Sequence, residues 1–126
     1  MGQKYLTDTN VVIDYFAQLL PINAINLIHT QPSQLSVVTR IELLSWQNLT
    51  PTETVFFTDF IQSCIVFELD ETVVVKTIEV RKKYKLKLGD AVIAATALLY
   101  NLTLLSRNVS DFKRVPELKI INPHEL

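Results

Sequence analysis

The feature that most constrains this chain is its alternation of short β-prone segments with stretches of helical periodicity. Strands of β-branched and aliphatic residues are predicted at 5–7, 34–38, 65–69, 102–105 and 119–121, and helical patterns separate them. Strands that alternate with helices indicate a parallel sheet that is covered on both faces. We therefore expect an α/β fold with a central, mostly parallel sheet of four to five short strands and helices on both faces.

Capping residues predict where the helices begin. Thr39 and Glu42 form a Thr-x-x-Glu capping box, in which each side chain bonds to the backbone of the other residue. We therefore expect a helix that begins at Thr39, directly after the second strand. The other expected helix starts are Asn10, Pro21, Thr50, Asp70 and Asp90.

Composition excludes several classes of function. The chain has 126 residues, 48% of them hydrophobic, which is typical of one globular domain. Its net charge of −1 excludes a global basic field that would hold nucleic acid. Glycine occurs only at positions 2 and 89, which excludes a Walker A loop and a dinucleotide fingerprint. The lone Cys64 and the distant His29 and His124 argue against zinc motifs and against Cys–His or Ser–His catalysis.

The chain also lacks targeting signals that can be recognised in the sequence. No apolar run approaches the roughly 18 residues that a membrane span needs. The first ten residues have no basic segment followed by an apolar run, so they do not resemble a secretory signal. We expect a cytoplasmic protein without membrane association.

Four acidic residues fall where the carboxyl ends of the expected strands meet. Asp8 ends the first strand, Glu42 follows the second, Asp90 opens a helix, and Asp111 follows the fourth strand. Ligand sites in such sheets form beyond the carboxyl ends of the strands. Carboxylates in one pocket raise each other's pKa, and a divalent cation removes that cost. An all-oxygen set indicates Mg²⁺ or Mn²⁺, on which a water can become the nucleophile.

Each acid also has a purely structural interpretation. Asp8 can serve a strand-end turn, Asp90 a helix cap and Asp111 a loop cap. Glu42 can serve the capping box alone, and its side chain is then bent back to the Thr39 amide and cannot reach far into the crevice. Because all four fall at the same end of the predicted sheet, we favour the functional interpretation.

Four blocks of sequence carry a resemblance to a known family. They are 8–14 (DTNVVID), 36–43 (SVVTRIEL), 88–97 (LGDAVIAATA) and 104–112 (LLSRNVSDF). In order and spacing they resemble the VapC-type toxins of the PIN-domain family, and the resemblance covers nearly the whole chain. It implies a single PIN-like nuclease domain over residues 1–126. It also implies a metal-dependent ribonuclease that cleaves RNA, often tRNA or rRNA, and is restrained by a cognate antitoxin.

The resemblance assigns roles to individual residues. By position, Asp8 and Asp90 match the principal metal ligands of the family, and Glu42 matches its third acid. Many members have an acid where Asn108 stands, so either Asp111 supplies that carboxylate or Asn108 orients a water on the metal. The expected catalytic and metal-binding residues are therefore Asp8, Glu42, Asp90 and Asp111. The residues expected to orient them are Thr9, Ser106 and Asn108.

Basic residues near the acids are candidates for binding the RNA backbone. Residues 81–87 (RKKYKLK) hold five of the twelve Lys and Arg residues and end three residues before Asp90. They either bind phosphates beside the site or stabilise a helix C-terminus in solvent. The side chains expected to contact phosphate are Arg40, Lys85, Lys87 and Arg107, for which ordinary surface ion pairs are the alternative.

A surplus of apolar residues indicates a protein partner. Six of them exceed what one small helical face normally buries: Phe16, Leu19, Leu20, Ile22, Leu44 and Trp46. They either line a groove for an antitoxin helix or a homodimer seam, or belong to an ordinary core. Together with the resemblance, they lead us to expect an antitoxin partner and a homodimer.

Three other functions are weighed against this prediction. A haloacid-dehalogenase-like phosphatase would use Asp8 as a covalent nucleophile, but it needs a second acid where this chain has Asn10. A partner-binding module without activity would have no need of all the expected acids. A housekeeping nuclease for RNA maturation would share the chemistry but not the toxicity. We therefore predict a Mg²⁺- or Mn²⁺-dependent endoribonuclease of the toxin type.

Overall fold

A five-stranded sheet forms the centre of the protein, as seen in a computed structural model that describes residues 2–126. The strands lie in the order β3-β2-β1-β4-β5, and all neighbouring pairs are parallel. The predicted parallel α/β sheet is confirmed. The strand bounds are β1 Tyr5–Thr7, β2 Gln34–Ser36, β3 Ile65–Phe67, β4 Thr103–Leu105 and β5 Ile120–Ile121.

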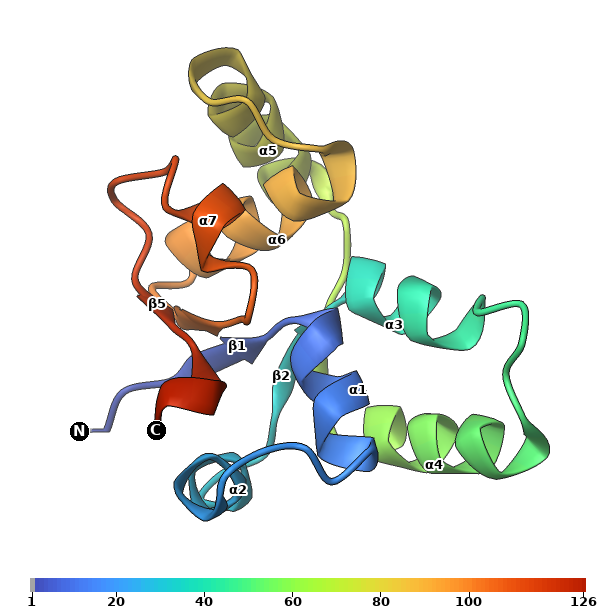
Figure 1. Ribbon diagram of the computed structural model, residues 1–126. Helices are drawn as coiled ribbons and strands as arrows, with labels where there is room; N and C mark the ends of the chain where they lie inside the picture. Colours follow the sequence, from blue (N-terminus) through green and yellow to red (C-terminus); the bar gives the residue numbers. More distant parts are fainter. Residues whose placement is uncertain (1) are drawn as a thin grey trace.

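Helices cover both faces of this sheet (Figure 1). On one face α5, α6 and α7 pack against Leu6 and Leu104, and on the other α1, α2 and α4 pack against Leu35 and Leu105. The helix bounds are α1 Thr9–Phe16, α2 Ile22–His29, α3 Val37–Leu44, α4 Pro51–Gln62, α5 Glu71–Lys83, α6 Leu88–Leu99 and α7 Val109–Phe112, and a 3₁₀ turn follows at Pro123–Glu125.

Helix α6 is apolar on every side because it lies inside the protein. Every side chain from Ala91 to Ala97 is buried, and α5 packs along its outer side. A helix that is hydrophobic all round is typical of such a buried position. Its first turn thereby reaches the carboxyl edge of the sheet. None of the helices described is both long and apolar enough to span a membrane.

The helix starts differ from the prediction where a strand runs directly into a helix. Asp8, not Asn10, caps α1, and its side chain accepts a hydrogen bond from the Thr9 amide at 2.8 Å. Ser36, not Thr39, caps α3, so β2 is shorter than predicted and the Thr39–Glu42 capping box does not form. The reason is that a good capping residue stands directly after β1 (Asp8) and at the end of β2 (Ser36), which leaves no room for a connecting loop.

The other starts follow the local signals more closely. The capping box of Thr50 and Glu53 forms at α4, and Asp70 caps α5. Helix α6 begins after Lys87, which places Asp90 in its first turn and not at its cap. This shift turns the Asp90 carboxylate away from a capping role.

A buried carboxylate ties the C-terminal end of the described chain to α1. Asp14 is only 2% exposed, and its two oxygens accept hydrogen bonds from Arg107 Nη1 at 3.2 and 3.0 Å. His124 Nε2 lies 2.7 Å from Asp14 Oδ2. Arg107 follows β4 and His124 lies in the 3₁₀ turn after β5, so Asp14 joins three segments.

We predict that Asp14→Ala destabilises the protein by about 1–3 kcal/mol, because two polar partners lose a buried acceptor. Urea unfolding followed by circular dichroism measures this change. The matched control is Asp59→Ala on the exposed side of α4, which should change stability by no more than about 0.5 kcal/mol. An Asp14→Ala protein as stable as the control would contradict the importance of this junction.

Candidate active site

An acidic cavity of about 310 Å³ lies at the carboxyl end of the sheet. Four regions contribute to it: the start of α1, helix α3, the first turn of α6 and the loop after β4. The structure therefore brings together three of the four predicted acids. The residues that line the cavity are Asp8, Thr9, Asn10, Ile13, Glu42, Trp46, Asp90 and Asn108.

The Asp8 carboxylate is the most constrained group in this cavity. It is 5% exposed, and its Oδ2 accepts hydrogen bonds from Ser106 Oγ at 2.7 Å and from Asn10 Nδ2 at 2.9 Å. Burial raises the pKa of Asp8, and the hydrogen bonds from Ser106 and Thr9 offset part of that increase. The nearby charges of Asp90 and Glu42 raise this pKa further. Asp8 is thus held in one orientation beside other acids.

The loop after β4 is bonded to the start of α1. Ser106 Oγ also accepts a hydrogen bond from the Asn108 amide at 2.9 Å, and the Arg107 amide donates to Asn10 Oδ1 at 3.0 Å. Asn10 therefore connects this loop to Asp8, a role that the capping interpretation of Asn10 did not foresee. Its position two residues after Asp8 in the DTN block was the signal that could have identified it.

Glu42 reaches the cavity from α3 and does not fold back on its own helix. The Thr9 hydroxyl donates to Glu42 Oε1 at 2.5 Å and lies 3.0 Å from the Thr39 hydroxyl. A β-carbon built on Gly89 would lie only 3.9 Å from Glu42 Oε2, so α3 is close to the first turn of α6 here. The capping-box interpretation of Glu42 is wrong, because Ser36 caps this helix.

Asp90 experiences the charges of the other acids directly. Burial raises the pKa of Asp90, and the charges of Asp111 and Glu42 raise it further, whereas the charge of Lys87 lowers it. An acidic cluster of this kind disfavours its own ionisation. It is therefore suited to binding positive charge.

Asp111 lies in a neighbouring cavity of about 540 Å³, which it shares with Asp90. It accepts a hydrogen bond from Asn108 Nδ2 at 3.1 Å and lies 3.4 Å from Arg114 Nη2. The predicted acids thus occupy two adjoining cavities. Within residues 2–126, no group of three or more Asp, Glu, His or Cys side chains lies in positions that could hold a metal ion.

The basic residues predicted to contact substrate are distributed unevenly. Lys85 and Lys87 line the neighbouring cavity with Asp90 and Asp111. Arg107 is paired with Asp14, although its side chain is still 55% exposed. Arg40 is exposed on α3 and lines neither cavity.

The six apolar residues predicted for a partner groove or a core divide into two groups. Leu20 is buried, and Phe16 packs against Phe56 and Phe57, so these two belong to the core. The other four are exposed by 38–67%: Leu19, Ile22, Leu44 and Trp46.

Comparison with known proteins identifies similar sequences. The family model described as PIN domain matches residues 5–118. Over 71 residues the chain is 37% identical to a ribonuclease VapC of Rickettsia bellii, a match that covers 52% of this chain and 53% of that protein. The chain thus matches only about half the length of this curated relative.

Solved structures extend the similarity to the whole fold. One chain of a toxin–antitoxin complex from Klebsiella pneumoniae superposes with a TM-score of 0.79 at 27% identity, covering 98% of this chain and 100% of that one. VapBC2 from Rickettsia felis, bound to a promoter DNA fragment, gives 0.78 at 21% identity and shares the fold, covering 95% of this chain and 98% of that one. The family model matches most of the chain, and the parallel sheet with acids at its carboxyl edge agrees with that match. The chain therefore belongs to the PIN domain family.

Proposed function

We propose that this protein is a Mg²⁺- or Mn²⁺-dependent endoribonuclease that hydrolyses RNA phosphodiester bonds and acts as the toxin of a toxin–antitoxin pair. The observation that carries the proposal is the meeting of Asp8, Glu42 and Asp90, from three separate elements, in one cavity. Membership of the PIN family and similarity to a protein named ribonuclease VapC support the activity. Similarity to a toxin–antitoxin complex supports the toxin role.

The residues present fit a hard divalent cation. The charged groups that line the acidic cavity are carboxylates, and hard cations prefer oxygen ligands. The raised pKa values of Asp8 and Asp90 mark a site where positive charge is stabilising. Mg²⁺ keeps several waters and needs only one or two direct carboxylates, so a group of three or more protein ligands is not required. We assign Asp8 and Asp90 as direct ligands, with Glu42 and Asp111 as the further acids.

When bound, the cation supplies Lewis-acid stabilisation of the negative charge that develops on the phosphate. The remaining work falls to this chain. Ser106 and Asn10 hold Oδ2 of Asp8, and the Thr9 amide holds its Oδ1. Thr9 binds only Oε1 of Glu42, which leaves Oε2 to accept a proton from an attacking water. In this proposal the water oxygen bonds to phosphorus, the bond between phosphorus and the 3′ oxygen breaks, and that oxygen takes a proton from solvent. The products then carry a 3′-hydroxyl and a 5′-phosphate.

The substrate in this proposal is RNA of the tRNA or rRNA class. Lys85 and Lys87 bind its phosphates on the Asp90 side of the acidic cavity, where they line the neighbouring cavity. Arg107 and Arg40 are assigned to further phosphate contacts. In the same proposal residues 1–126 form a single nuclease domain in the cytoplasm. A homodimer and a cognate antitoxin cover exposed apolar side chains such as Leu19, Ile22 and Trp46.

We predict that the purified protein cleaves structured RNAs, including total tRNA, in Mg²⁺ or Mn²⁺ and not in EDTA. Asp8→Asn and Asp90→Asn should each lower the cleavage rate at least about 100-fold, because each removes a negatively charged metal ligand. Denaturing gels of end-labelled RNA measure the rate. Asp59→Asn, an exposed change of the same chemistry, is the control. A wild-type rate in either site variant would refute the metal assignment.

We also predict that the wild-type and Asp90→Asn proteins differ in thermal stability, whether or not substrate is present. The raised pKa values of Asp8 and Asp90 mean that the folded state binds more protons than the unfolded state above the ordinary carboxyl pKa. Without metal, stability therefore falls as pH rises through that window. Asp90→Asn should raise the Tm in EDTA by about 2–4 °C near neutral pH, and the difference should narrow toward about pH 4.

The same melting experiment tests metal binding. Mg²⁺ or Mn²⁺ should raise the Tm of the wild-type protein, because a ligand that binds only the folded state stabilises it by mass action. The Asp90→Asn protein should show little of this increase. Scanning calorimetry at several pH values provides both measurements. If Asp90→Asn melts lower than wild type in EDTA at neutral pH, then burial and the nearby carboxylates do not make the charge of Asp90 destabilising, and this prediction is wrong.

A further inference from the structure

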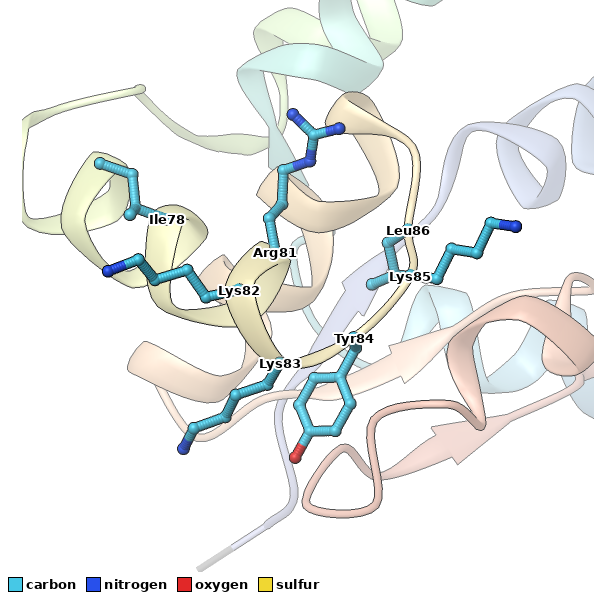
Figure 2. A pocket seen from close by; sticks show the side chains of 7 residues that line it. All are labelled: Ile78, Arg81, Lys82, Lys83, Tyr84, Lys85 and Leu86. Atoms are coloured by element: carbon cyan, nitrogen blue, oxygen red, sulfur yellow. The ribbon is translucent and has the colours of Figure 1, made fainter.

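A surface rich in positive charge adjoins the acidic cavity. The cavity shared by Asp90 and Asp111 is also lined by Arg81, Lys85, Lys87 and Arg114. Arg81 and Lys85 also line a larger cavity of about 690 Å³. We call these two cavities together the cationic trough. Its far part, shown in Figure 2, is lined by Ile78, Arg81, Lys82, Lys83, Tyr84, Lys85 and Leu86.

The trough adjoins the acidic cavity. Arg81, Lys85 and Leu86 are common to both of its parts, and Asp90 is common to the nearer part and the acidic cavity. A chain molecule that lies along the trough toward Asp90 would reach the acidic cavity next. Along this path the far part of the trough contains cations without carboxylates, the nearer part contains cations with Asp90 and Asp111, and the acidic cavity contains only carboxylates as charged groups.

The turn that presents these cations is held in place. Tyr84 ends α5 in an extended conformation, and its hydroxyl donates to Glu117 Oε1 at 2.7 Å. Leu86 is buried, and the Lys85 carbonyl accepts a hydrogen bond from Arg114 Nη1 at 3.0 Å. Lys82 and Lys83 extend from one side of this turn and Lys85 from the other (Figure 2). These contacts hold the backbone that carries the basic side chains in one conformation.

The charge of the trough is not balanced within the protein. Six of the twelve Lys and Arg residues line it, although the net charge of the chain is −1. Of these six, only Lys83 and Arg114 form ion pairs with other described residues, at 3.9 and 3.4 Å. The helix dipole accounts for cations in the last turn of α5, but Lys85, Lys87 and Arg114 lie beyond that helix. Gathered cations with few partners favour a polyanion.

We propose that the cationic trough binds the phosphate backbone of one RNA strand for several nucleotides on one side of the bond that is cut. This inference rests on the proposed nuclease function and adds Arg81, Lys82, Lys83 and Arg114 to the substrate contacts. The trough recognises charge and not base identity, because six of the side chains that line it are cations, which pair with phosphate. Affinity therefore grows with the length of RNA flanking the cut.

The test uses the double variant Lys82→Gln/Lys83→Gln at the far end of the trough. Its matched control is Lys4→Gln/Lys119→Gln, which removes the same charge from exposed residues that line neither part of the trough. Fluorescence anisotropy measures the binding of labelled single-stranded RNAs of about 4 and about 20 nucleotides, in EDTA and over a range of KCl concentrations. EDTA prevents cleavage during the measurement.

For the longer RNA, the trough variant should bind about tenfold more weakly than wild type at low salt. The slope of log K against log salt should become shallower by about 1.4, which corresponds to two lost phosphate contacts. The shorter RNA should lose less affinity, and the control should match wild type with both RNAs. Equal slopes in variant and control, or equal losses for short and long RNA, would overturn the extended subsite.

Asp90→Asn separates this inference from the proposed function. It keeps every cation of the trough, so in EDTA it should bind the longer RNA at least as tightly as wild type while failing to cleave it in Mn²⁺. A wild-type protein that binds with the predicted length and salt dependence but cleaves no RNA would refute the nuclease and keep the trough as a binding site. A protein that cleaves RNA but shows no effect of the trough variant would refute the trough alone.

Discussion

The buried carboxylate of Asp8 is the interaction on which the carboxyl edge of this fold depends. Its backbone amide donates to the Leu105 carbonyl at 2.9 Å, and its Oδ1 caps α1. Its Oδ2 receives the Ser106 hydroxyl and the Asn10 amide group. Burying a charge is costly unless hydrogen bonds compensate for the lost water. One side chain therefore sets the start of α1, the path of the loop after β4 and the orientation of the acidic cavity.

The second organising feature is the separation of charge. A net charge near zero excluded a global field, but the fold sorts the charges into an acidic cavity and a cationic trough that meet at Asp90. The pKa of Asp90 reflects this boundary, since Asp111 and Glu42 raise it and Lys87 lowers it. The proposed cleavage of RNA uses both signs of charge. Cations bind the negatively charged phosphates, and carboxylates hold a metal ion.

Local signals in the sequence were reliable where one interpretation was available and unreliable where two competed. At Thr50 only one capping box fits, and it forms. At residues 36–42 the sequence predicted Thr39 as the cap, but Ser36 caps the helix in the structure, and this choice depends on packing. Thr39 is fully buried beside Thr9, so it lies within α3, and Glu42 is released to face the cavity. A capping motif is recognised within four consecutive residues. The burial of Thr39, in contrast, depends on its contact with Thr9, which is 30 residues away in the sequence.

The sequence by itself determined the parallel α/β architecture and the placement of the acids at one edge, because strand periodicity and chain direction are properties of short segments. Only the tertiary structure decided which side chains meet. It separated Asp111 from the acidic cavity and brought Arg114 beside Lys85. It also paired Arg107 with Asp14, a residue that no local pattern singled out. These contacts join residues 29 and 93 positions apart, and their geometry depends on how helices pack on both faces of the sheet.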